Sequence, residues 1–192
     1  MKPTPQPAVK TNTNPYANEE NVVLRFFVRY LDKPMFSGTP RQTTVGEYVI
    51  SSLAEDEMVS LDPVFNKMLQ LYIDAPERTK LTPDFFTNMA DPDISTLAAN
   101  YLSEDRKLSE MHSRYATVLE EEQMLDSLVV RTLDQLRLRK ILVTIDQLSA
   151  QLKQAEAANE PEEKILEIMN QLALWSKMKK MMSTTLGGLS VI

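Results

Sequence analysis

The chain has 192 residues and a formal net charge of −6, and hydrophobic residues make up 43% and charged residues 25% of it. This is the composition of a globular domain with its own core, and its acidic balance argues against strong nucleic-acid binding, which needs a basic surface. Cysteine is absent, which excludes disulfides and fits a cytoplasmic protein. We expect no contact with a membrane and no export, because the sequence lacks both a long apolar run and a signal peptide.

The first 18 residues contain four prolines and few apolar side chains. Such a composition predicts a linker without a core of its own, because little apolar surface is available to offset the entropy of ordering it. We therefore assign residues 1–18 to a linker, and we favour the interpretation that the chain is a fragment of a longer protein.

Residues 19–143 carry repeated helix-start signals. Val22–Leu31 is apolar nearly all round, and we expect a buried helix there rather than a strand. Thr44 and Glu47 have the spacing of a capping box. A capping residue followed by proline then recurs at 62–63, 82–83 and 91–92. These recurring helix-start signals predict an all-α fold in which residues 19–143 form a compact multi-helix bundle.

From the end of this region onward the sequence predicts one long helix, which begins within the bundle, and a second helix that returns along it. From about Glu121 to Ala158 there is neither proline nor glycine. The apolar residues surround the helix up to Val143 and then narrow to one stripe, which indicates that the helix leaves the bundle. A turn at 157–163, with Asn159 as a cap, leads into the returning helix. We expect a projecting antiparallel hairpin over 144–187 and a tail at 188–192. Its interior is assigned to Ile145, Leu148, Leu152, Ile165, Ile168, Leu172 and Trp175.

The returning helix has a second apolar face. At 100° per residue, Leu174, Met178 and Met181 lie roughly opposite the side that closes the hairpin. We interpret this face as a partner-binding surface, with Lys177 and Lys180 at its polar rim. Two alternatives remain open: the face folds back on the bundle, or it forms the seam of a weak homodimer.

The sequence gives little support for a catalytic site, and we predict neither a metal site nor a cofactor. His112 is the only histidine, and a solvated or core position explains it better than a role as general base. Residues 120–122 are acidic and suit the start of the long helix, while Asp91 and Asp93 are explained as a helix cap. A basic cluster is interpreted as salt-bridge partners of local acids rather than a nucleic-acid site. It comprises Arg131, Arg137, Arg139 and Lys140.

Four segments carry a resemblance to a known family. Residues 48–72, 91–104, 136–156 and 162–187 resemble, in this order, the C-terminal helicase-binding domain of bacterial DnaG-type DNA primases, particularly of the Bacteroides-like branch. The resemblance implies a helical bundle followed by a helical hairpin that docks on the N-terminal domains of the hexameric replicative helicase.

On that reading the chain is a non-catalytic part of the replisome that couples primer synthesis to unwinding. Residues 1–18 would then lead from the catalytic core. Two rivals are a standalone homo-oligomeric helical scaffold and, more weakly, a metal hydrolase built on helices. The Glu/His spacings that such an enzyme needs are absent from the sequence.

Overall fold

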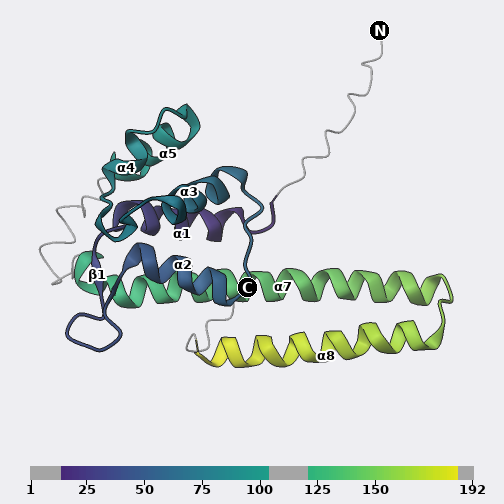
Figure 1. Ribbon diagram of the computed structural model, residues 1–192. Coiled ribbons are helices and arrows are strands. Elements are labelled where there is room, and N and C mark those ends of the chain that lie inside the picture. The colour runs from purple at the N-terminus through teal and green to yellow at the C-terminus, as the bar shows by residue number, and fades with distance from the viewer. Residues whose placement is uncertain (1–13, 104–120, 186–192) are drawn as a thin grey trace, which may run out of the picture.

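The computed structural model describes residues 14–103 and 121–185. The fold is all-α, as the sequence predicted, with one small two-stranded sheet among the described residues. A group of short helices lies at one end of the molecule, and two long antiparallel helices project from it (Figure 1). The histidine at position 112, Glu120 and the tail at 188–192 lie outside the described residues.

The bundle is built around α1 (Ala17–Arg29), which is buried on most sides, including Val23, Leu24 and Phe27. The other bundle helices are α2 (Val45–Glu55), α3 (Pro63–Asp74), α4 (Asp84–Thr87) and α5 (Pro92–Ser103), with a 3₁₀ turn η1 (Arg78–Lys80) after α3. Strands β1 (Pro34–Met35) and β2 (Thr43–Thr44) pair antiparallel just before α2. These strands were not predicted, since two residues are too few to show an alternating pattern.

The capping interactions predicted at the starts of the bundle helices are mostly confirmed. The Thr44 hydroxyl accepts a hydrogen bond from the Glu47 amide at 3.3 Å, and the Asp62 carboxylate accepts from the amides of Val64 and Phe65. The prediction at Thr82 was wrong in detail, because α4 has only four residues and no side-chain cap. The Thr82 carbonyl instead accepts from the Phe85 amide at 2.9 Å, which suffices for a single turn.

The boundary of the predicted linker also differs in the structure. Helix α1 begins at Ala17, and the residues just before it contact the bundle. The Asn14 amide donates to Glu20 at 2.6 Å, and the Arg139 guanidinium donates to the Pro15 carbonyl at 2.9 Å. Residues 14–18 therefore belong to the bundle, because their polar groups find partners there.

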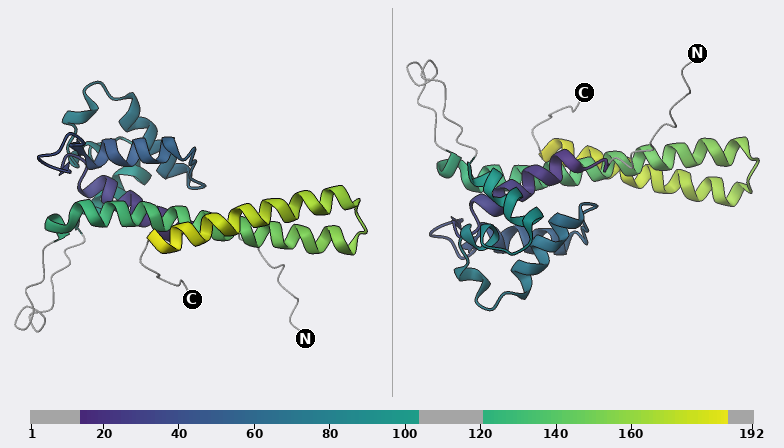
Figure 2. Two further views of the ribbon diagram at one scale, coloured as in Figure 1. Left: turned by 90° about the horizontal axis from the view of Figure 1, so that it is seen from below. Right: turned by 90° about the horizontal axis from the view of Figure 1, so that it is seen from above.

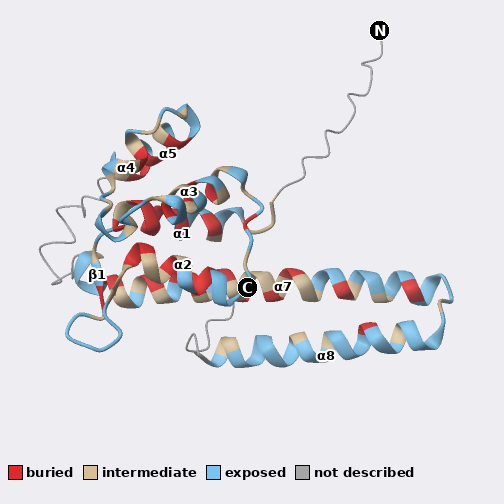
Figure 3. Cartoon of the chain, in the orientation of Figure 1, coloured by how far each residue is buried: buried red, intermediate tan, exposed pale blue. Residues whose placement is uncertain are grey.

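The long helix α7 (Leu125–Ala157) is continuous and follows a 3₁₀ turn, η2 (Glu121–Met124). Its first part enters the bundle core with Leu125, Val129 and Leu133, and its second part extends beyond the bundle in all views (Figure 2). A turn with Asn159 at a positive φ of 51° reverses the chain into α8 (Glu162–Thr185). Buried positions are dense in the bundle and sparse in the hairpin (Figure 3), so the hairpin has a separate and thinner core.

Candidate interaction surface

The hairpin is closed by one face of each helix. Leu148 and Ala155 of α7 and Ile168 of α8 are its buried centre. Leu152, Ile165, Leu172 and Trp175 are partly buried and pack against these three residues. Ile145, also assigned to the hairpin interior from the sequence, is only half-buried and is not part of this cluster. Residues that recur every three or four positions thus meet along the seam, as an antiparallel helix pair requires.

The opposite side of α8 leaves large apolar side chains in solvent. Leu174 is 58%, Met178 39% and Met181 63% exposed. Leu166, 56% exposed, lies about two turns nearer the tip than Leu174 and about 80° from it around the axis, and it was not among the predicted surface residues. We call Leu166, Leu174 and Met178 the outer face of α8. An amphipathic helix that served only its own hairpin would carry polar residues at these positions.

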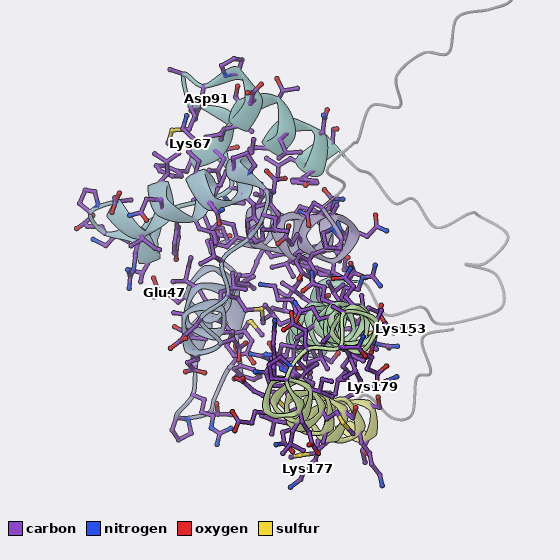
Figure 4. The ribbon with its side chains drawn as sticks, turned by 90° about the vertical axis from the view of Figure 1, so that its right-hand side faces the viewer. Glu47, Lys67, Asp91, Lys153, Lys177 and Lys179 are labelled. Atoms are coloured by element: carbon purple, nitrogen blue, oxygen red, sulfur yellow. The ribbon has the colours of Figure 1, made fainter. Side chains whose placement is uncertain are left out.

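The charges of α8 are divided along its length, apart from Lys164 near the tip, which forms an ion pair with Glu160 at 2.9 Å. Glu162, Glu163 and Glu167 lie near the tip of the hairpin, whereas Lys177, Lys179 and Lys180 lie near the bundle, and all six side chains are exposed. Viewed along the hairpin, Lys177 projects on the side away from the bundle, and Lys179 lies on the flank that also carries Lys153 (Figure 4). A partner on the outer face would therefore meet carboxylates at one end and ammonium groups at the other.

Three members of the basic cluster on α7 hold the helix to the bundle. The Arg137 guanidinium donates to Asp56 at 2.6 Å and to Asp134 at 2.8 Å, while Arg139 binds a backbone carbonyl as described above. The Lys140 ammonium donates to the Val59 carbonyl at 3.4 Å, and burial lowers its pKa. These contacts occupy the cations within the molecule, and Arg131 is the exposed member of the cluster.

The acidic residues considered in the sequence also have structural partners. The Glu121 carboxylate accepts from Arg25 at 2.9 Å and from the Tyr30 hydroxyl at 2.8 Å. Burial alone would raise the pKa of Glu121, but the hydrogen bond from Tyr30 and the charge of Arg25 outweigh it and lower the pKa. Asp91 accepts from the Asp93 amide at 3.0 Å and forms an ion pair with Lys67 (Figure 4).

Across residues 14–103 and 121–185, no group of three or more acidic or histidine side chains is placed to hold a metal ion. In the same part of the chain, no helix has the length and apolar character that a bilayer crossing requires. The packing of the hairpin does not account for the exposed apolar face of α8.

Fold and surface together define an all-α domain in which a helical bundle carries a projecting hairpin with one uncovered apolar face. The chain belongs to the family described as a domain of unknown function (DUF8430), whose model matches residues 7–191. Comparison with curated proteins and with solved structures gives no match.

Proposed function

We propose that this chain is a non-catalytic interaction domain that binds the N-terminal domains of a hexameric replicative helicase through the outer face of α8. One observation carries the proposal of a docking surface: the hairpin closes on one face of α8 and leaves Leu174 and Met178 exposed on another. The choice of partner is supported by the resemblance of four segments to the helicase-binding domain of primases. In this role the domain would couple primer synthesis to unwinding within a cytoplasmic replisome.

The size of the outer face indicates how such binding would work. Burying each large apolar side chain contributes about 1.5–3 kcal/mol, whereas association costs about 4–15 kcal/mol. Leu166, Leu174 and Met178 would therefore bind a single partner domain only weakly. A ring of identical domains raises the effective concentration of sites when several copies of the chain are tethered near it. Each single contact can therefore be weak while several copies together bind the ring more tightly.

The proposal is tested by titration calorimetry of the chain against the replicative helicase of the same organism, both as its isolated N-terminal domain and as the hexamer. We expect saturable binding to both forms, and a Leu174→Asp variant should bind at least about 10-fold more weakly, because a charge replaces a buried apolar contact. Its helical circular dichroism should be unchanged, since Leu174 is 58% exposed.

Met169→Asp is the matched control. Met169 is 51% exposed on the same helix, and it lies about 140° around the axis from Leu174 but only about 60° from Leu166. Its replacement should therefore weaken binding less than Leu174→Asp does. Equal losses in both variants would show that the charge of α8 rather than its outer face matters. Absence of binding to either helicase form would overturn the partner, and the alternative of a homo-oligomeric scaffold, with two outer faces in contact, would then be examined by sedimentation.

A further inference from the structure

A second apolar surface lies in the bundle, between α2 and α3. It is an open groove of about 590 Å³, to which α2 contributes Ile50 and Leu53 and α3 contributes Leu69 and Ile73. Val59, in the connection between the two helices, forms one end of the groove. Val59 is 74% and Ile73 40% exposed, so the groove presents large apolar side chains to solvent. We call this feature the α2–α3 groove.

The end of the groove near Val59 is fixed by α7. Asp56, just before this end, accepts from Arg137, and the Val59 carbonyl accepts from Lys140 at 3.4 Å. The Ser60 amide donates to the Asn66 side chain at 3.2 Å, which ties the connection to the first turn of α3. A groove whose end is held by these contacts needs little reorganisation to accept a ligand, which lowers the entropic cost of binding.

The rim of the groove is acidic. Glu57 lines it directly, and Asp74 lies at the end of α3, where it accepts from Gln70, another lining residue, at 2.8 Å. Within the described part of the chain neither carboxylate forms an ion pair. Glu57 has a positive φ of 50° because it ends α2 in a left-handed cap, in which the Met58 amide donates to the Leu53 carbonyl at 2.9 Å. An apolar groove with an acidic rim is complementary to a helix that combines apolar and cationic side chains.

We propose that this groove takes the α8 helix of a second copy of the chain. Leu174 and Met178 are one turn apart and exposed, and Lys177 lies between them in sequence and projects away from the bundle (Figure 4). The two apolar side chains enter the groove while Lys177, which precedes Met178 on α8, meets a carboxylate of the rim, Glu57 or Asp74. The entering helix comes from another molecule, because α8 lies along α7 in its own chain. This inference does not depend on the helicase, but it uses the same face of α8, so self-association competes with that partner.

The contact joins two different surfaces and is small. Either two copies exchange their α8 helices reciprocally in a closed dimer, or successive copies form short open chains. Only a few anchoring side chains take part, so the interface belongs to the weak, transient class. Because ammonium and carboxylate groups meet at its rim, self-association should weaken as the salt concentration rises.

The test is sedimentation velocity of the full chain across a range of concentrations, with one variant for each surface. Val59→Asp places a charge in the groove, and Leu174→Asp places one on the outer face. Each should raise the apparent dissociation constant of self-association at least about 10-fold. An equimolar mixture of the two should associate again, because the groove of the Leu174→Asp chain accepts the intact α8 of the Val59→Asp chain. Val22→Asp, at a 36% exposed site on α1, is the control and should behave as the wild type.

The outcomes separate the two proposals. Normal association of Val59→Asp together with loss in Leu174→Asp would overturn the groove in favour of contact between two outer faces. A mixture of the two variants that stays monomeric, or a wild-type chain that stays monomeric up to about 1 mM, in the range of the weakest specific contacts, would also overturn it. Val59→Asp should bind the helicase domain as the wild type does, whereas Leu174→Asp should bind it at least about 10-fold more weakly, so failure of one proposal is recognised independently of the other. Circular dichroism verifies that every variant is folded.

Discussion

Adding a single methyl group at Gly46 should destabilise the bundle. Gly46 lies in the first turn of α2, and a Cβ atom there would be 2.6 Å from the Tyr72 hydroxyl oxygen and 2.9 Å from Leu31 Cδ1. Tyr72 and Leu31 are 0% and 1% exposed, so neither has space to withdraw. Alanine gains up to about 1 kcal/mol over glycine in a helix, whereas overpacking a core costs about 1–3 kcal/mol. The steric cost exceeds the helix gain over most of its range, and we expect a net loss of up to about 2 kcal/mol in the free energy of unfolding.

Urea unfolding of Gly46→Ala measures this loss, and a second variant identifies its cause. Burial and the adjacent Glu47 raise the pKa of Tyr72 to about 12, so its neutral hydroxyl donates to Glu47 at 3.2 Å. Tyr72→Phe alone loses that hydrogen bond, at about 1 kcal/mol, but removes the closest clashing atom. The double variant should therefore lose less than the sum of the two single changes, by at least about 0.5 kcal/mol. A Gly46→Ala chain as stable as the wild type, or strictly additive losses, would refute the steric reasoning.

Two further predictions concern the thin hairpin core and the start of α7. Ile168→Ala should cost about 2–5 kcal/mol of local stability. It should increase amide hydrogen exchange in α8 but not in α1, because the two cores are separate. Met169→Ala is its exposed control, and faster exchange in α1 as well would show that the bundle and the hairpin unfold as a single cooperative unit. Glu121→Gln should cost about 1.5–3 kcal/mol at neutral pH, measured by urea unfolding, since the carboxylate accepts from Arg25 and Tyr30. The folded pKa of Glu121 is lowered from 4.5, so its contribution is present above about pH 4.5 and is lost as the pH falls through the folded value. The difference between wild type and variant should vanish in acid, and a pH-independent difference would contradict this assignment.

Features that depend on a few neighbouring residues were predictable from the sequence. The hydroxyl at Thr44 and the carboxylate at Asp62 cap the helices that follow them, as their spacing indicated. The long helix and its return are equally local in origin, because they follow from the absence of proline and glycine and from one apolar stripe. At Thr82 the same signal did not produce a side-chain cap, because the single turn of α4 needs only backbone hydrogen bonds.

Features that depend on how distant segments meet were not predictable. Val59 lies in a connection without any periodic pattern, and only the arrangement of α2 and α3 makes it one end of a groove. The two-stranded sheet likewise pairs Pro34 with Thr44 across a loop, and no local signal announces that pairing. On α8 the helical phase placed Leu174 away from the hairpin seam, but the exposure of Leu166 was not predicted. That residue lies among acids near the tip, outside the segment that contains Met178 and Met181.

The continuity of α7 has a mechanical consequence. Its 33 residues span about 50 Å, and no proline or glycine between Leu125 and Ala157 supplies a hinge. One end of α7 is packed in the bundle, and α8 packs along its other end. A tilt of about 5° at the fixed end would therefore displace the tip by roughly 4 Å over that length. Any load applied to α8 is transmitted to the bundle as torque rather than absorbed by a flexible joint, so the bundle sets the direction in which the hairpin points.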